Sequence, residues 1–408
     1  NLSRYVAVGG GYTSGYSDSA LYLSAQRYSY PAILASRFAL AGGGAFEQPL
    51  VNAGVGIGLK GNARYHLIDT VDCLGNSYLK AAPVSPVGDL TNYNWIGAYG
   101  PYNNMGVPGT RMANVFLQSF GDPSMFIGNP FYARFASNPG ISTIIGDAIG
   151  QAPTFYTIWM GLEDIYGYAR RGGKESGDTI TSVQSFIGGY TSLIAGMKAV
   201  GAHGVIANLP APGTMPFFNA VAVDGLLLTQ QQADSLNMLY APINPAIVFQ
   251  QGRNRYVIND NSAPGGRRQI ETGEKLLLTL PMDSIRCYSW GRLVPIPSRY
   301  VLDAQELGLV NDAVINYNAA ISQLGQQEGI PVVSMYDLFN EVAQGSSFGG
   351  TVLSAAYPKG GFYSVDGFFP TPRGYAFIAN RFVSVINTAF QAKLPFADIN
   401  SYPAVAFP

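Results

Sequence analysis

Few side chains in this sequence can act as a base, a nucleophile or a metal ligand. His66 and His203 are the only histidines, so a metal centre could use two imidazoles at most. Cys73 and Cys287 are the only cysteines, and their wide separation does not fit a zinc site or a disulfide-rich scaffold. The sequence is as compatible with two buried free thiols as with one disulfide between them. We therefore expect no metal and no cofactor.

Composition narrows the class of protein. Of 408 residues, 47% are hydrophobic and 12% are charged, which excludes a disordered chain. The net charge is -1 and the sequence has no run of Lys and Arg, so we exclude nucleic-acid binding. No apolar stretch reaches the roughly 18 residues of a membrane span, and the first residues lack the apolar core of a signal peptide. We expect a mature or trimmed soluble domain.

Short apolar runs that end at a glycine or a proline recur along the chain. The first covers residues 4–8 and stops at three consecutive glycines, the pattern of a buried strand that enters a tight turn. Similar runs cover residues 155–160, 204–209 and 330–334. Each run lies close to a helical pattern, and this alternation predicts βαβ units with a parallel sheet. A ligand site is then expected beyond the carboxyl ends of the strands.

Two helices have clear start signals. Asp303 can cap a helix, and Glu306 three residues later completes a capping box. Thr371 followed by Pro372 marks the start of a second helix. The apolar stripe of the first helix has intervals of three and four residues and consists of Leu307, Val310, Val314, Tyr317, Ile321 and Leu324.

Residues 216–299 interrupt the alternation of strands and helices. Their middle part is polar and contains glycines, and an apolar run follows at residues 276–280. We interpret this stretch as an insertion within a single domain of residues 1–408. It could form a lid over the site or merely extend the same domain.

Four segments, in the right order, resemble the sequence blocks of the SGNH, or GDSL-type, esterase and lipase family. They are residues 5–22 (YVAVGGGYTSGYSDSALY), 104–109 (NMGVPG), 158–164 (IWMGLED) and 366–375 (DGFFPTPRGY). The first is most similar to large extracytoplasmic members from the Bacteroidota. The resemblance implies a flavodoxin-like three-layer α/β/α sandwich.

The resemblance also implies where a catalytic site would lie. In the family, a serine after the first strand is the nucleophile, a histidine is the base and an aspartate orients the histidine. The serine amide, a glycine amide and an asparagine side chain hold the oxyanion. At the matching positions this chain has Gly11 for the serine, Glu163 for the asparagine and Phe369 for the histidine. Only Gly109 and Asp366 keep the residue of the family pattern.

Each of the three replacements is disabling for its own reason. Gly11 has no side chain that could form an acyl-enzyme, and Phe369 cannot accept a proton. An ionised Glu163 would place negative charge where the transition state develops negative charge. In serine hydrolases the loss of the nucleophile or the base alone costs about a factor of a million in rate.

Other residues near these positions offer alternatives. Thr13, Ser14 and Ser17 carry hydroxyls close to the glycine turn, and Ser14 or Ser17 could serve as an unconventional nucleophile. Asp366 could be a remaining triad acid that now binds a ligand, or a capping aspartate before a glycine. Glu163 and Asp366 could also form a carboxylate pair for acid/base work. A group of aromatic residues could line a groove or simply pack: Phe362, Tyr363, Phe368 and Phe369.

We therefore expect a non-catalytic SGNH homologue that acts as an extracytoplasmic binding or assembly component. The resemblance implies export and attachment to the outer membrane or cell surface by a lipid anchor rather than a spanning helix. The expected partners are an outer-membrane or surface protein complex, or a glycan. The alternatives are an active carbohydrate or lipid esterase and a structural subunit of a larger surface assembly.

Overall fold

The computed structural model describes residues 1–125, 128–173 and 179–408, and its centre is a parallel sheet of five strands. The spatial order is β13-β6-β5-β1-β4, and every pairing is parallel. Numbered along the chain and read from the β4 edge, this is the order 2-1-3-4-5 of flavodoxin-like sheets. The predicted α/β fold with a parallel sheet is confirmed. The strands are β1 (Tyr5–Gly9), β4 (Asn104–Gly106), β5 (Phe155–Trp159), β6 (His203–Ala207) and β13 (Val332–Val333).

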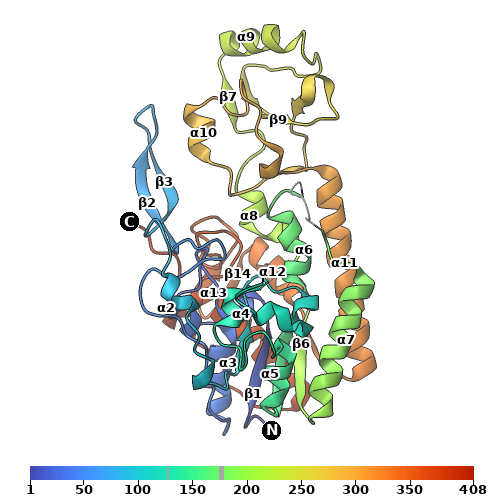
Figure 1. The fold of residues 1–408 in the computed structure, drawn as a ribbon. Coiled ribbons are helices and arrows are strands. Elements are labelled where there is room, and N and C mark those ends of the chain that lie inside the picture. Colours follow the sequence, from blue (N-terminus) through green and yellow to red (C-terminus); the bar gives the residue numbers. More distant parts are fainter. Residues whose placement is uncertain (126–127, 174–178) are drawn as a thin grey trace.

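Helices pack against both faces of this sheet (Figure 1). On one side α3 (Tyr30–Ala39) packs against α13 (Pro372–Phe390). On the other side α7 (Val183–Ala199) packs against both α5 (Ile144–Gly150) and α11 (Ala304–Glu328). The helices α7 and α11 form the right-hand edge of the lower part in Figure 1. The arrangement has the three layers that the family resemblance implies.

Local signals explain where the two longest of these helices begin. The Asp303 side chain accepts from the backbone N–H of Glu306, and the Glu306 side chain accepts from the N–H of Asp303, so the predicted capping box of α11 is present. Thr371 caps α13, and Pro372 is its first residue. The predicted apolar stripe of α11 is buried from Val310 to Leu324, while Leu307 is partly buried at its start.

The shorter elements connect these layers. The two that matter most for the site are α1, directly after β1, and α6, directly after β5. The connecting elements are α1 (Gly11–Ser14), α2 (Leu23–Arg27), α4 (Pro130–Ala133), α6 (Leu162–Ala169), α12 (Met335–Gln344), β14 (Ser346–Phe348) and β15 (Thr351–Leu353).

Residues 216–299 project from the carboxyl end of the sheet, at the top of Figure 1. Within them a second hydrophobic cluster, centred on Tyr240, Val257 and Leu276, is separate from the cluster around the main sheet. Whether this region acts as a lid stays a prediction. Its elements, with the strand that follows it, are α8 (Pro216–Asn219), β7 (Leu226–Leu228), α9 (Gln230–Tyr240), β8 (Gly252–Asn254), β9 (Val257–Asn259), β10 (Arg267–Gln269), β11 (Lys275–Leu276), α10 (Met282–Cys287) and β12 (Val301–Leu302).

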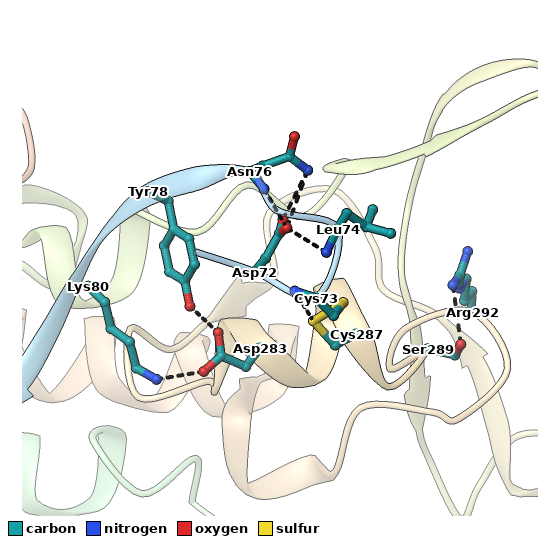
Figure 2. Close-up of a disulfide and its surroundings, with 10 residues drawn as sticks. All are labelled: Asp72, Cys73, Leu74, Asn76, Tyr78, Lys80, Asp283, Cys287, Ser289 and Arg292. Atoms are coloured by element: carbon teal, nitrogen blue, oxygen red, sulfur yellow. Dashed lines mark hydrogen bonds and ion pairs between the residues drawn. A yellow bond between two sulfur atoms is a disulfide. The ribbon is translucent and has the colours of Figure 1, made fainter. Parts of the chain in front are cut away.

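A hairpin of β2 (Tyr65–Val71) and β3 (Ser77–Pro83) reaches toward this insertion. A disulfide joins Cys73 at the hairpin tip to Cys287 at the end of α10 (Figure 2). The alternative of two free thiols is therefore wrong, and folding brings together cysteines that are 214 residues apart. Three further contacts lie beside the disulfide. Tyr78 and Lys80 both donate to the carboxylate of Asp283, and the guanidinium of Arg286 lies 3.7 Å from the ring centre of Tyr78.

In the residues that the structure describes, the helices are all too short or too polar to cross a lipid bilayer.

We predict that the disulfide fixes the hairpin to the insertion. In a Cys73→Ser/Cys287→Ser variant, amide hydrogens of residues 65–83 and 282–287 should exchange faster, because the covalent link is gone and only non-covalent contacts such as those of Asp283 and Arg286 remain. The free energy of unfolding should fall by about 2–4 kcal/mol, as is typical when a disulfide is removed. Hydrogen–deuterium exchange and urea unfolding measure the two effects. Wild-type protein kept in reductant is the matched control, and exchange unchanged in both samples would contradict the prediction.

Candidate active site corner

The site lies where the strand order of the sheet reverses. The carboxyl ends of β1 and β5 are neighbours, with Gly9 paired to Trp159. After Gly9 the chain turns into α1, and after Trp159 it turns through Gly161 into α6. Gly161 has a φ of 109°, and a Cβ there would lie 2.9 Å from the Phe186 ring, so glycine is required. Ligands of open α/β sheets bind at this type of switch point.

The ring of Phe369 fills the corner. A Cβ built on Gly11 would lie 2.6 Å from Cε1 of Phe369, which is closer than real Cβ contacts allow. The same ring packs against Tyr12 and Tyr16, with ring centres 5.2 and 4.8 Å away, and Phe369 is only 6% exposed. The space left open to the centre of a water molecule is about 10 Å³. That is about enough for one water molecule and too little for a substrate.

Glu163 is held at the rim of this small cavity by a cation. Its Oε2 accepts from Nη2 of Arg170 at 2.6 Å, and both side chains are 19% exposed. The guanidinium of Arg170 also lies over the ring of Phe368, 4.7 Å from its centre. Glu163 therefore accepts hydrogen bonds here and cannot replace the amide donor of an oxyanion hole.

Asp366 uses both of its oxygens to hold backbone. Oδ1 accepts from the N–H groups of Phe368 and Phe369 at 2.9 and 2.8 Å, and Oδ2 accepts from the N–H of Ser19 at 2.7 Å. Burial raises the pKa of Asp366 above its usual range, against the effect of these donors. This geometry is that of a turn-capping aspartate. Asp366 and Glu163 also line different cavities, so the structure does not bring them together as a pair.

The two histidines lie away from the corner. His203 is exposed and begins β6, at the opposite end of the sheet. His66 is exposed on the hairpin, opposite Ala82. Neither imidazole can therefore take a proton from a group at Gly11.

The neighbouring hydroxyls already have partners. Ser14 donates to the carbonyl of Gly11 at 2.9 Å, and Ser17 donates to the carbonyl of Pro370 at 2.8 Å. The hydroxyl of Thr13 lies 3.1 Å from that of Tyr30. All three side chains are buried. Their hydroxyls serve as structural links between the first and last blocks or within the turn.

Gly109 lies in a turn directly before the cavity lining. Gly109 has a φ of 78°, and the turn is fixed by Asn129, whose amide donates to the carbonyl of Pro108 at 2.8 Å. The next residue, Thr110, lines the small cavity, and its buried hydroxyl has no hydrogen-bond partner among the described residues. Sequence reasoning missed Thr110, although its place directly after the second block would have identified it.

Two further carboxyls were also missed, those of the partly buried Asp18 and the buried Asp164. Burial raises the pKa of Asp18 to about 6, although the hydroxyl of Tyr22 donates to it at 2.6 Å and the N–H of Val365 at 3.1 Å. Burial likewise raises the pKa of Asp164, next to Glu163, to about 6. Both residues lie inside segments that carry the family resemblance. Among the described residues, His, Cys, Asp and Glu side chains form no group of three or more that could hold a metal ion.

A flavodoxin-like sheet whose first strand enters a glycine corner beneath the loop before the last helix has the architecture of an SGNH-type hydrolase. The sequence matches the family model of GDSL-like lipases and acylhydrolases over residues 5–382, so the chain belongs to this family. A comparison with curated proteins finds no match.

Several solved structures are similar to the chain. One is an alpha/beta hydrolase enzyme, LAE5, from the metagenome of Lake Arreo, with 11% identity, a TM-score of 0.40, and coverage of 95% of this chain and 96% of that chain. The second is a catalytic mutant of Axe2, an acetylxylan esterase from Geobacillus stearothermophilus, with 11% identity, a TM-score of 0.39, and coverage of 94% of each chain. The third is an extracellular lipase from Streptomyces rimosus, with 11% identity, a TM-score of 0.37, and coverage of 95% of this chain and 99% of that chain.

We predict that Asp18 makes stability depend on pH. Because its pKa is raised from 3.8 to about 6 in the folded state, the folded chain binds more protons than the unfolded chain between these values. The contribution of Asp18 to stability is therefore full below pH 4 and lost as the pH rises through 6, by on the order of 3 kcal/mol. Asparagine tolerates the positive φ of residue 18, 51°, and does not ionise.

The measurement is urea unfolding of wild type and Asp18→Asn at pH 4, 5, 6 and 7. Relative to wild type, the variant should gain stability across this range. In Asp234→Asn, an exposed change on α9, the free energy of unfolding should depend on pH in the same way as in wild type. A gap between Asp18→Asn and wild type that stays constant from pH 4 to 7 would show that Asp18 is not the group responsible.

Proposed function

We propose that this member of the GDSL-like lipase/acylhydrolase family does not hydrolyse esters and acts instead as a binding or assembly component. The proposal is carried by one observation, the Phe369 ring that occupies the space of a side chain at position 11. A nucleophile, a base and a substrate carbonyl would all have to share that space. The ion pair of Glu163 with Arg170 supports the same conclusion, because it places an acceptor where an oxyanion needs donors.

We further propose an extracytoplasmic location, with a lipid anchor at the outer membrane or cell surface. The Cys73–Cys287 disulfide supports an oxidising compartment, where such bonds form and persist. The anchor itself follows only from the resemblance to the Bacteroidota members.

A protein partner is favoured over a glycan by the surface of the insertion. Five large apolar side chains there are more than half exposed: Leu227 at 69%, Met238 at 73%, Val248 at 62%, Tyr288 at 70% and Leu293 at 51%. Exposed apolar side chains are a feature of protein interfaces more than of glycan sites with polar walls. Affinity purification of the tagged protein from its native membranes, followed by cross-linking at these residues, tests this role. Cross-links confined to other surfaces would contradict it.

We predict that wild-type protein neither turns over chromogenic acetyl and butyryl esters nor reacts with a fluorophosphonate probe. Gly11→Ser should remain inactive, because no imidazole is present. It should also lose about 1–3 kcal/mol of stability, because the new Cβ meets the Phe369 ring. Ester hydrolysis, probe labelling and urea unfolding measure these three outcomes.

Gly213→Ser is the matched control, since a Cβ at Gly213 meets nothing within 4 Å. It should leave stability nearly unchanged. In Gly11→Ser/Phe369→His the smaller ring should relieve part of the clash. Labelling of wild type that disappears in Ser14→Ala or Ser17→Ala would establish an unconventional nucleophile and defeat the proposal.

A further inference from the structure

A cavity of about 400 Å³ lies between three segments that are far apart in the sequence. The β2–β3 hairpin, the start of α10 with the turn before it, and the loop that leads to Asp366 each contribute one wall. Its size is within the range of roughly 300–1,000 Å³ found for small-molecule sites.

This cavity is distinct from the closed catalytic corner. The residues that line the two cavities do not overlap. The ring of Phe217 lines the larger cavity and packs edge-on against Phe368, which lines the corner, with ring centres 6.1 Å apart. A layer of aromatic rings therefore separates the two spaces.

The backbone holds two of the walls together. The N–H of Phe217 donates to the carbonyl of Gly367 at 2.8 Å, and the N–H of Leu278 donates to the carbonyl of Phe217 at 2.9 Å. The third wall, the hairpin, is fixed by the disulfide and by the contacts of Tyr78 and Lys80 with Asp283 (Figure 2). The cavity is therefore a built feature with walls held by covalent and hydrogen bonds.

The cavity lining is mostly apolar, and its acidic and basic side chains differ in whether they already have partners. Most of the lining is apolar or aromatic, including Leu278, Leu280 and Met282. Both acidic residues are already engaged, since Asp366 binds three backbone N–H groups and Asp283 binds Tyr78 and Lys80. On the cationic side, Nη1 of Arg286 is buried without an acceptor among the described residues. Arg286 lines the cavity, and a buried unpaired N–H is unfavourable, so a ligand acceptor that reached this guanidinium would satisfy an unused donor.

We infer that this cavity binds a small amphiphile, with an apolar body against Leu278 and Met282 and an anionic group paired to Arg286. The inference goes beyond the proposed function and holds whether or not the chain hydrolyses esters. A charge-assisted bond inside a largely apolar cavity is strong, so the charge of the ligand should dominate selectivity.

Three probes that share a naphthalene ring and differ in charge test the inference. Calorimetric titration of the full chain with 2-naphthoate, 2-naphthamide and 2-naphthylmethylammonium compares anion, neutral molecule and cation. We expect 2-naphthoate to bind with one site and at least about tenfold more tightly than the other two. Octanoate, an aliphatic anion, should compete with 2-naphthoate for that site.

Variants locate the bound probe. Arg286→Gln should weaken 2-naphthoate binding about tenfold or more and leave 2-naphthamide binding nearly unchanged. Ala81→Trp should abolish binding by filling the cavity from the hairpin side. Arg253→Gln removes the same charge from an exposed arginine of the insertion that does not line the cavity, and it should bind like wild type.

Several results would overturn the inference. These are no binding of either anion at millimolar concentration, equal binding of the cation, or unchanged binding in Arg286→Gln. If a variant does not fold, the comparison of the three naphthyl probes on wild-type protein decides whether the inference holds. Hydrolysis of naphthyl or octanoyl esters in the same samples would defeat the proposed lack of catalysis while leaving the binding result intact.

Discussion

The closed corner depends on the hydrogen bonds that the partly buried carboxylate of Asp366 accepts from the backbone. The carboxylate ties the N–H of Ser19, in the first block of the chain, to the N–H groups of Phe368 and Phe369 in the last block, across 347 residues. In an intact family site the matching aspartate is expected to orient a histidine. Here the same position orients a phenylalanine by fixing its backbone. The carboxylate at this position therefore positions backbone, through the N–H groups of Ser19, Phe368 and Phe369.

The consequence is a hydrolase architecture with its switch point filled. Phe369 packs against Gly11, Tyr12 and Tyr16, and Tyr12 in turn donates from its hydroxyl to the carbonyl of Phe368 at 2.6 Å. Aromatic packing of this kind adds to the area that is buried and stabilises the corner. Glycine at position 11 and the ring at position 369 are complementary, because a larger residue at either place would overlap the other. The packing that stabilises this corner is therefore also the packing that fills its pocket.

The sequence predicts the framework well and the long-range contacts poorly. Four of the five sheet strands and the capped starts of α11 and α13 are visible because their signals are local: apolar runs, glycine turns and capping residues. The strand β4 was missed because three residues are too few for a period. The site residues followed from the family resemblance, and three of them, Gly11, Glu163 and Phe369, line one cavity. Gly109 lies in the turn before Thr110, and the oxygens of Asp366 hold backbone.

Other parts of the site depend on tertiary folding. The pairing of Cys73 with Cys287 and the cavity beside it arise only when the hairpin meets the insertion, and no local pattern encodes that meeting. The partner of Glu163, Arg170, lies seven residues on, about two turns along α6, and helical spacing could have suggested it. The partial burial of Asp18 and the full burial of Asp164 could not be read from residue type, since aspartate is seldom fully buried.

The cross-link between the hairpin and α10 also turns the chain into a covalent ring with two tails. The ring runs from Cys73 to Cys287 and contains β4, β5 and β6, three of the five strands of the central sheet. A protease that cut the exposed turns of the insertion before Cys287 would leave both fragments joined through sulfur. Such a cut would convert one chain into two that stay covalently linked.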